Sequence, residues 1–389
     1  MRDNDLELYI HIPFCRRKCA YCDFLSFPSD EATIQRYVRA LQGELRMHRA
    51  DVAGRSVKSV FIGGGTPSIV DPWLISDIMD VVRHDYPVSD DAEITIEMNP
   101  GTVTADALKL YRRSGINRLS IGLQSADNRL LEHLGRIHTF ERFLKTYDLC
   151  RRTGFDNINI DLMSGLPGQS IADWQDTLMK VTSLRPNHIS AYSLIVEEGT
   201  PFYEKYGAED ETRRCGGETA LLPSEEEVRA MDILAREILE SRGYHQYEFS
   251  NYAKKGFECY HNIGYWTGRD YLGFGLGASS LFNHERRTVC SDIYDYMEAI
   301  EAGDEAPCDV TELTRKDEME EFMFLGLRMT QGISRDDFEE RFDASLSGVY
   351  GDVLNKYSAA GLLAMSEGRV MLTPEGVEVS NIVLADFLL

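Results

Sequence analysis

The chain has 389 residues and a formal net charge of −23 at pH 7, with 41 Lys and Arg against 64 Asp and Glu. This length leaves room for two or more domains with ample cores. The acidity argues against general nucleic-acid binding, because phosphate contacts require clustered Lys and Arg. Eight cysteines, three of them in one short stretch, do not form a disulfide framework. With no secretory signal and no bilayer-spanning run, we expect a reducing, cytoplasmic location. Contact with a membrane surface through a partner stays open.

Strand-like and helix-like segments alternate along the first half of the chain. Apolar patterns predict six strands, over residues 6–12, 57–62, 93–98, 118–122, 157–162 and 188–194. Amphipathic patterns predict helices between them, the first two over residues 31–49 and 72–86. Regular β–α alternation implies parallel strands joined by crossovers, so six units make either an open doubly wound sheet or a partial barrel. In both architectures, ligands sit at the carboxyl ends of the strands.

Three cysteines follow the first predicted strand in the segment HIPFCRRKCAYCDF, with the spacing C-x3-C-x2-C. Thiolates from Cys15, Cys19 and Cys22 suit zinc or an iron–sulfur cluster. A zinc site normally takes four protein ligands, and Phe24 stands where a fourth cysteine could have been. The alternative is a trio of buried structural thiols, which the basic neighbours disfavour because positive charge stabilises thiolates. The pattern predicts a [4Fe–4S] cluster with one iron open to a small molecule.

Polar and glycine residues follow the other predicted strands at their carboxyl ends. The second strand leads into GGGTP at residues 63–67, and the next three are followed or closed by Glu97, Gln124 and Asp161. Parallel strands buried on both faces should be apolar, so charged or amide groups there need a reason. Taken singly, Asp161 could cap a helix and Glu97 could pair with an arginine. Together with the cysteine loop, these residues predict one ligand pocket.

The pattern changes in the second half of the chain. Residues 197–223 are rich in Gly, Glu and Pro, and we expect a loop there. Ser224 and Glu227 then predict a capping box that starts an amphipathic helix. The aromatic, glycine-rich residues 247–282 favour a β-rich extension packed against the barrel. Within it, His261 is either a satisfied core histidine or a ligand, and the residue type alone favours the core histidine.

The C-terminal part is expected to form a separate unit. Three helical patterns and two short apolar runs, LLAMS and RVMLT, favour a winged-helix arrangement, with the helices over residues 314–329, 334–342 and 346–359. Winged helices often bind DNA, but acidic side chains crowd these helices, so phosphate would be repelled and a lid or protein-contact role is expected. The predicted domains are residues 1–200, 201–305 and 306–389.

The cysteine spacing, the GGGTP segment and this order of rim residues resemble the coproporphyrinogen III oxidase-like branch of the radical S-adenosylmethionine (SAM) superfamily, over nearly the whole chain. The resemblance implies an α/β fold, with a partial (β/α)6 TIM-like barrel, a β-containing extension and a small winged-helix-like C-terminal domain. It also implies a [4Fe–4S] cluster on Cys15, Cys19 and Cys22, served by an electron donor. The residues it assigns to SAM are Tyr9, Tyr21, Gly64, Gly65, Thr66, Glu97, Gln124, Arg136, Asp161 and Ile195.

Each group in the SAM set has an implied task. The two tyrosines flank SAM, and the glycine loop takes up its methionyl end, because glycine permits close backbone approach. Glu97 and Arg136 address the amino and carboxylate groups, a task suited to the arginine fork. Gln124 and Asp161 hold the ribose hydroxyls, and Ile195 lines the adenine.

A second motif, H-N-x-x-Y-W, comprises His261, Asn262, Tyr265 and Trp266. It resembles the haem-binding motif of the HemW-type haem chaperones within this branch. A neutral imidazole is a good axial ligand for haem iron, and aromatic neighbours can cover a porphyrin face. Cys259, two residues before the motif, is a rival ligand.

Two functions stay open, with a radical SAM enzyme acting on an unrelated substrate as a third and weaker alternative. The first is a haem chaperone that binds a [4Fe–4S] cluster, SAM and haem, and delivers haem to haem-requiring acceptors such as respiratory enzymes at the membrane surface. The second is a radical SAM porphyrin enzyme, of the oxygen-independent coproporphyrinogen III oxidase or haem-degrading type, that generates a 5′-deoxyadenosyl radical. The true oxidases have a C-x3-C-x2-C-x-C loop, and Phe24 replaces the last cysteine here, so the resemblance favours the chaperone. No nucleic-acid partner is expected.

Overall fold

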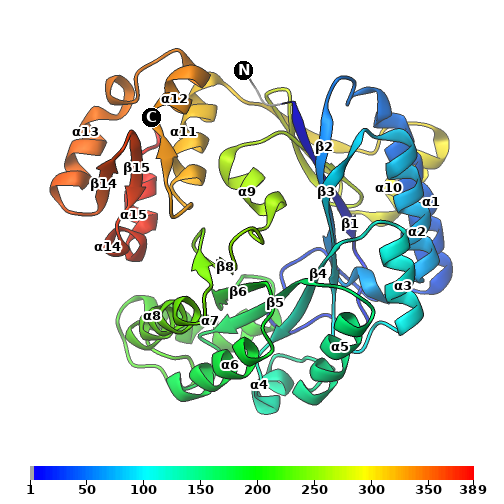
Figure 1. The fold of residues 1–389 in the computed structure, drawn as a ribbon, viewed down its shortest axis with the longest axis horizontal. Helices are drawn as coiled ribbons and strands as arrows, with labels where there is room; N and C mark the ends of the chain where they lie inside the picture. Colours follow the sequence, from blue (N-terminus) through cyan, green and yellow to red (C-terminus); the bar gives the residue numbers. More distant parts are fainter. Residues whose placement is uncertain (1–3) are drawn as a thin grey trace.

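The structure is a computed structural model and describes residues 4–389. Its centre is a curved sheet of parallel strands (Figure 1), namely β1 (Asp5–Ile12), β2 (Ser56–Gly64), β3 (Val88–Met98), β4 (Arg118–Gln124), β5 (Asn157–Ser164) and β6 (His188–Ser193). These six strands neighbour one another in sequence order, as expected for successive β–α units. The predicted partial (β/α)6 barrel is confirmed.

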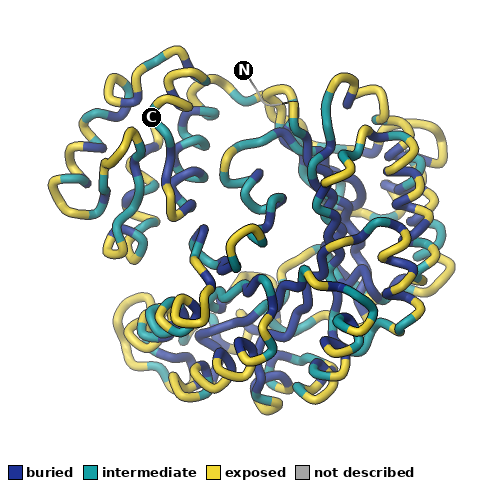
Figure 2. Tube along the Cα trace, in the orientation of Figure 1, coloured by how far each residue is buried: buried dark blue, intermediate teal, exposed yellow. Residues whose placement is uncertain are grey.

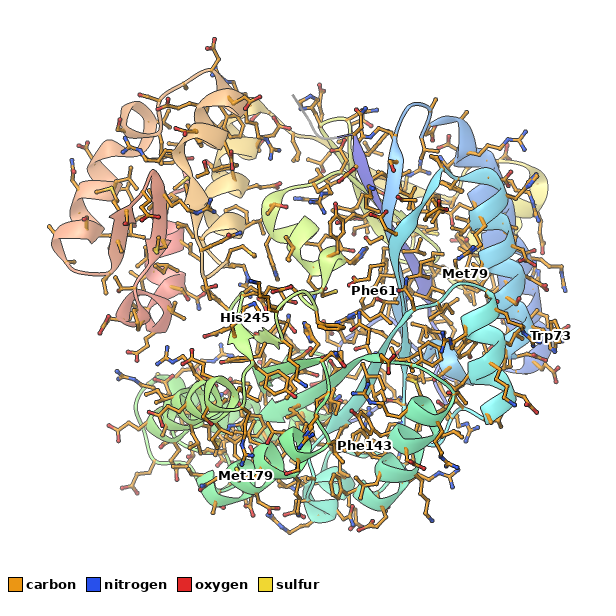
Figure 3. All side chains as sticks on the ribbon, in the orientation of Figure 1. Phe61, Trp73, Met79, Phe143, Met179 and His245 are labelled. Carbon is orange, nitrogen blue, oxygen red and sulfur yellow. The ribbon has the colours of Figure 1, made fainter. Side chains whose placement is uncertain are left out.

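Helices cover the convex face of this sheet (Figure 1). They are α1 (Glu31–Met47), α2 (Pro72–Asp85), α3 (Ala105–Arg113), α4 (Asn128–His133), α5 (Phe140–Arg152) and α6 (Ile171–Ser183), with short 3-10 turns η1 (His48–Ala50) and η2 (Pro67–Ile69). Capping side chains such as Asp30 and Thr104 accept N–H groups that the first turn leaves free. In Figure 3, Met79 and Phe143 lie on these outer helices, and both are fully buried, whereas Trp73 is 64 % exposed.

The strands alternate between an apolar face toward the helices and a polar face inside the barrel. In β1, every second residue from Leu6 to Ile12 is fully buried in the main core. The residues between them, and their counterparts on the next strands, are mostly polar: Glu7, Tyr9, His11, Ser59, Glu93, Thr95, Arg118, Ser120, Asn159, His188 and Ser190. Figure 2 shows the strands as the most buried part of the barrel. Polar groups buried there must find partners, so this face builds the networks described below.

The second half of the chain extends the same sheet at both edges. β8 (Asn251–Ala253) and β7 (His245–Gln246) lie beyond β6. At the other edge, β9 (Tyr271–Phe274) pairs in parallel with β1, and β10 (Ser279–Phe282), β11 (Glu285–Val289) and β12 (Cys308–Glu312) follow as antiparallel strands. The result is one 12-stranded sheet.

Two helices in this half correct the sequence-based prediction. The expected loop at residues 197–223 contains α7 (Pro201–Arg214), which begins with a Thr200 cap and a proline in its first turn. The expected β-rich segment contains α9 (Tyr260–Thr267), on the concave side of the sheet (Figure 1). The predicted capping box at Ser224 is confirmed at the start of α8 (Glu225–Ser241), which packs on α6, and α10 (Ile293–Ala302) packs on α1.

The C-terminal domain has the predicted helices followed by a β-hairpin. Its helices are α11 (Arg315–Gly326), α12 (Arg335–Phe342) and α13 (Leu346–Ala359), and its sheet is β13 (Ile333–Ser334), β15 (Arg369–Leu372) and β14 (Leu363–Ser366). Two short helices that we did not predict, α14 (Pro374–Glu378) and α15 (Ser380–Ala385), end the chain. The domain has its own hydrophobic core, and α9 lies between it and the barrel (Figure 1).

Candidate functional site

A cavity of about 310 Å³ lies beside the cysteine loop at the carboxyl ends of the parallel strands. The predicted residues that line it are Cys15, Cys19, Tyr21, Cys22, Gly64, Gly65, Thr66, Glu97, Gln124, Arg136 and Asp161. Polar residues that we did not predict complete the wall, namely Asn99, Ser120, Ser190, Tyr192 and Asn251. The topology therefore brings the cysteine loop and the strand ends to one place.

Two residues predicted to contact SAM lie outside this cavity. Tyr9 is on the inner face of β1, where its hydroxyl lies 2.9 Å from His11 Nδ1 and its ring stacks on Phe61. Ile195 follows β6 and is 61 % exposed. Phe24, which replaces the possible fourth cysteine, lines the cavity mouth and is 69 % exposed.

The cysteine loop is held by backbone hydrogen bonds and by an arginine. Cys15 N–H donates to Phe27 O at 3.1 Å, and Ala20 N–H donates to Leu134 O at 3.1 Å. Arg136 Nη1 donates to Cys19 Sγ at 3.6 Å. All three thiols are free, with Cys15 buried and the other two half-buried.

The arrangement of the thiols fits a cluster better than a single ion. Within residues 4–389, no three His, Cys, Asp or Glu side chains are grouped closely enough to hold one metal ion. Tetrahedral zinc needs its ligands around one point, whereas each thiolate of an iron–sulfur cube binds a different iron. Burial raises the pKa of the Cys15 and Cys22 thiols, so these groups gain from the positive charge of a cluster.

The glycine loop lies tightly against the cysteine segment. Gly64 has φ of 112°, and a Cβ atom there would lie 2.7 Å from the His11 ring. A Cβ atom on Gly65 would lie 2.5 Å from the carbonyl oxygen of Phe14, to which Thr66 N–H donates at 2.8 Å. No other residue type fits both positions, so the backbone itself forms this wall of the cavity.

Glu97 and Asp161 place two buried carboxyl groups on the cavity wall. Burial, and then the nearby Asp161, raise the pKa of Glu97 to about 8, although Gly64 N–H donates to its Oε2 at 3.1 Å. Burial also raises the pKa of Asp161, which accepts from Asn159 at 2.7 Å. Because an opposite charge favours the ionised form, this pair fits a ligand that brings a cationic group.

Contacts with the backbone and the local backbone conformation fix the orientation of the Arg136 and Gln124 side chains. Arg136 Nη2 donates to Asn99 Oδ1 at 2.6 Å and to Gly122 O, while its Nε is buried without a partner. A Cβ atom on Gly122 would lie 2.9 Å from that guanidinium. Gln124 has φ of 73° beside a register shift between β4 and β5, and its Oε1 accepts from Tyr192. A bulge of this kind re-aims a side chain at a strand end.

The residues of the H-N-x-x-Y-W motif face two different regions. His261 is buried, with Nδ1 2.8 Å from Ser59 Oγ and Nε2 3.0 Å from the Tyr265 hydroxyl. Burial lowers its pKa to about 3, so the ring is neutral, and Phe61 stacks on it at 5.1 Å. Trp266 instead lines a second cavity toward the C-terminal domain. The structure therefore does not bring His261 and Trp266 to one cavity, and Asn262 is half-buried on the same helix.

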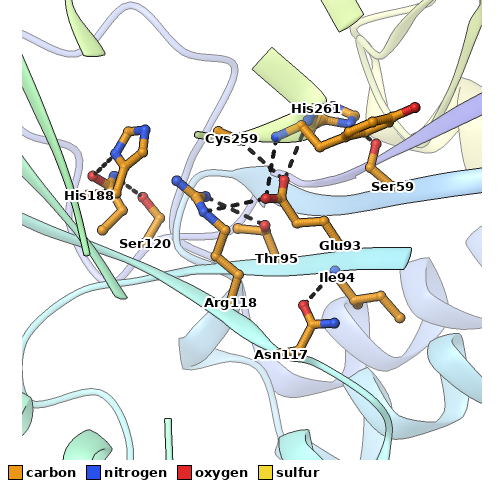
Figure 4. A network of polar contacts seen from close by, with 12 residues as sticks. Ser59, Glu93, Ile94, Thr95, Asn117, Arg118, Ser120, His188, Cys259 and His261 are labelled. Carbon is orange, nitrogen blue, oxygen red and sulfur yellow. Dashed lines mark hydrogen bonds and ion pairs between the residues drawn. The ribbon is translucent and has the colours of Figure 1, made fainter. Parts of the chain in front are cut away.

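The half-buried Glu93, paired with the buried Arg118, holds the amino end of α9 (Figure 4). The Glu93 carboxylate accepts from Cys259 Sγ and from the N–H groups of Tyr260 and His261, at 3.3, 3.3 and 3.4 Å. Arg118 Nε lies 3.8 Å from Glu93 Oε2. Since the N-cap residue makes no side-chain cap, Glu93 supplies the negative charge that favours a helix N-terminus. Burial raises the pKa of the Cys259 thiol, which disfavours it as a thiolate ligand.

A chain of hydrogen bonds joins the cavity to α9. Asn159 Nδ2 donates to Asp161, and its Oδ1 lies 2.6 Å from His188 Nδ1. His188 Nε2 lies 2.8 Å from the Tyr247 hydroxyl, which accepts from Cys259 N–H at 3.3 Å. We did not predict this network. Its signal in the sequence is the polar residue at every second position of otherwise apolar strands.

Comparisons with known proteins agree with this architecture. A family model described as the radical SAM superfamily matches residues 9–181, and one described as the HemN C-terminal domain matches residues 313–379. The solved structure of coproporphyrinogen III oxidase (HemN) from Escherichia coli covers 100% of this chain and 90% of its own with a TM-score of 0.84 at 24% identity, which shows the fold. None of the helices within residues 4–389 combines the length and apolar composition that a bilayer crossing needs.

Two proteins named heme chaperone HemW are similar over nearly the whole chain. The Bacillus subtilis protein is 37% identical over 381 residues, which is 98% of both chains. The Lactococcus lactis protein is 33% identical over 98% of this chain and 97% of its own. The radical SAM match implies a [4Fe–4S] cluster and SAM as cofactors. The chain therefore belongs to the HemW family of the radical SAM superfamily.

Proposed function

We propose that this protein is a haem chaperone, which binds haem and delivers it to haem-requiring acceptor proteins such as respiratory enzymes at the membrane surface. The similarity to a protein named heme chaperone HemW, 37% identical over 98% of both chains, carries the proposal. The aromatic motif on α9 supports it, as does Phe24 in place of a fourth cysteine in the cluster loop.

In this proposal Cys15, Cys19 and Cys22 hold the [4Fe–4S] cluster at the cavity mouth, within reach of a separate electron donor. The bound cluster supplies an open iron for SAM. The glycine loop takes the methionyl end, where Glu97 faces the ammonium and Arg136 the carboxylate.

The other assigned residues divide by their position. Tyr21, Gln124 and Asp161 line the cavity. In this proposal Tyr21 flanks SAM, and Gln124 and Asp161 hold its ribose hydroxyls. Tyr9 and Ile195 do not line the cavity, and the proposal keeps them as contacts at the edge of the bound SAM.

For His261 to contact haem, the hydrogen bonds that hold its ring on α9 must change. Axial ligation by His261 requires one ring nitrogen to leave Ser59 or Tyr265, and Cys259 is disfavoured by its protonated, buried thiol. Each such hydrogen bond is worth about 0.5–1.5 kcal/mol, which a metal–ligand bond can offset. Asn262 and Trp266 complete the proposed haem-contact set.

The alternative is a radical SAM porphyrin enzyme, of the coproporphyrinogen III oxidase or haem-degrading type. One observation favours it: polar groups suited to SAM line the cavity beside the cysteine loop without an obvious gap. The two functions differ in what happens to the porphyrin.

A pair of assays on the reconstituted, reduced protein tests the proposal. With SAM and coproporphyrinogen III, mass spectrometry should find no protoporphyrinogen IX, and with SAM and haem it should find haem intact. Haem-loaded protein mixed with an apo-acceptor should give the absorbance of the loaded acceptor. Robust turnover of coproporphyrinogen, or of haem, together with no transfer would overturn the chaperone in favour of the enzyme.

A further inference from the structure

A second cavity lies between α9 and the C-terminal domain, with a volume of about 670 Å³ against about 310 Å³ at the cysteine loop. Its wall is built by the end of α9, by α11 and α12, and by the segment around β13. No cysteine of the loop and no residue assigned to SAM lines it. Its volume falls within the range of roughly 300–1,000 Å³ that is typical of cofactor sites.

Aromatic side chains enter this cavity from both sides. Trp266 comes from α9 and Phe322 from α11. The indole Nε1 of Trp266 is buried and has no hydrogen-bond partner, and the Arg328 guanidinium lies 4.4 Å from the ring centroid. A buried donor left unpaired costs free energy. This wall therefore favours a flat aromatic ligand that carries a hydrogen-bond acceptor for the Trp266 N–H.

Arg369 adds a fixed positive charge. Its Nε and Nη2 donate to the carbonyl oxygens of Gln331 and Gly332, both at 2.7 Å, which orients the guanidinium at the wall. Within residues 4–389, no carboxylate forms an ion pair with it. An oriented arginine without an acidic partner favours a carboxylate on the ligand.

Several other charged lining residues are already paired. Arg269 pairs with Glu7 at 2.8 Å, and Asp270 pairs with Arg55 at 2.6 Å. His284 lies 2.7 Å from Glu318 across the wall, and Asp337, Glu340 and Arg341 add charges of both signs. The total charge of the wall therefore does not select an anion, whereas the oriented guanidinium of Arg369 does.

The barrel interior at His261 offers no comparable space. The imidazole is 1 % exposed, both ring nitrogens are engaged, and Phe61 stacks on its face. A porphyrin cannot reach that ring while α9 keeps this position. In the second cavity, by contrast, Met329 lines the wall and offers a thioether, a ligand type that haem iron accepts.

We propose that the cavity between α9 and the C-terminal domain is where this chain holds haem, with the porphyrin against Trp266 and Phe322 and a propionate on Arg369. The proposal rests on the proposed chaperone function. With α9 in the position described here it places the ligand away from His261, so ligation by that ring would belong to a different position of α9. It assigns the C-terminal domain a direct part in haem binding.

Filling the cavity tests this placement. Gln331 is exposed and lines the wall, and it meets Arg369 only through its backbone carbonyl, so Gln331→Trp occupies the space and keeps that hydrogen bond. The matched control is Gln175→Trp, on the exposed face of α6. Haem titrations of the full chain, followed by absorbance, should show at least tenfold weaker binding for Gln331→Trp and parent-like binding for the control. SAM binding should be unchanged in both.

Arg369→Met is the second variant, and it should also weaken haem binding several-fold without changing the iron content of the cluster. If both cavity variants bind haem like the parent while His261→Ala binds it weakly, the placement is overturned and the chaperone function stands. If the parent binds no haem at all, the function itself fails, so the two failures are distinguishable.

Discussion

Cys15, Cys19 and Cys22 lie in one loop. Burial raises the pKa of the Cys15 and Cys22 thiols, so a positive partner would favour their ionised form. We expect anaerobic reconstitution to give about four irons and four sulfides per chain with the broad visible absorption of a [4Fe–4S] cluster. The triple Cys→Ala variant should lose both, whereas Cys215→Ala, at an exposed cysteine outside the loop, should keep them. Full iron content in the triple variant would place the ligands elsewhere.

Glu97 is the residue where neutralising one charge should be most informative. Glu97→Gln keeps the shape and an acceptor for Gly64 N–H, and removes the charge that would face the SAM ammonium. We expect SAM binding to weaken by about 1.5–3 kcal/mol, the scale of a hydrogen bond to a charged group, measured by calorimetry. Glu226→Gln, at an exposed site on α8, is the control. If Glu97→Gln binds SAM as tightly as the parent protein, the SAM ammonium must contact a residue other than Glu97.

The same carboxyl group predicts a pH dependence of stability. The pKa of Glu97 is about 8 in the ligand-free fold, against 4.5 as its ordinary value. Between those values the folded state holds a proton that the unfolded chain releases, so this contribution to stability is complete below pH 4.5 and is lost as the pH rises to 8. Urea unfolding should show the parent losing up to about 1.4 kcal/mol per pH unit relative to Glu97→Gln. Parallel pH profiles for the two proteins would contradict this assignment.

Single residues were predictable where topology alone sets their position. Glu97 and Asp161 lie in the carboxyl-terminal halves of parallel strands, so the rule that ligands sit at the carboxyl ends placed them on the cavity wall. The direction of Ile195 was not predictable, because a side chain just beyond a strand takes its direction from the following turn. The same holds for Gln124, whose orientation depends on a positive φ that non-glycine residues rarely adopt.

Among the elements, α9 depends most on a distant side chain. Glu93 accepts from three donors at its amino end and is the carboxylate nearest to the buried Arg118. Glu93→Ala should lower the free energy of unfolding by about 3–5 kcal/mol, because it leaves a buried charge without its partner. Hydrogen exchange should also quicken at residues 260–261. Glu226→Ala, on the exposed first turn of α8, should lower the free energy of unfolding far less. Equal losses in the two variants would show that Glu93 does not hold α9.

Helices were predictable where the local sequence contains capping residues and good helix formers, and α9 has few of either. The capping box at Ser224 predicted α8, whereas α9 has no side-chain cap and contains Gly264, a poor helix former. The structure explains this glycine, because a Cβ atom there would lie 2.0 Å from Glu7 Oε1. A contact between residues so far apart in sequence leaves no trace in a local pattern.

At the scale of the whole molecule, the barrel and the C-terminal domain have separate hydrophobic cores. We therefore expect calorimetry to show more than one unfolding transition. Haem bound between α9 and the C-terminal domain should raise the temperature of the transition of that domain, since a ligand stabilises the state that binds it. A single transition that haem does not move would contradict both expectations. The cavity variant Gln331→Trp should show the transitions without the shift.

The order of the whole sheet was beyond prediction from sequence. The six parallel strands followed from regular alternation, but nothing local indicates that β9 pairs with β1. Strands that join a sheet at a distant edge are selected by which edge remains open, and that is a property of the assembled barrel. For the same reason, the polar inner face was visible in the sequence only after the strands were placed.

The pairing of β9 with β1 also has a consequence for biosynthesis. β1 leaves the ribosome long before β9, and this neighbour is not made until residues 271–274 are translated. At roughly 5–20 residues per second, that edge stays open for on the order of ten seconds or longer, during which it can pair with other chains. The cysteine loop gains its contact from Phe202 N–H to Ala20 O well before then. A nascent chain can therefore complete the surroundings of its cluster site while its sheet is still unfinished.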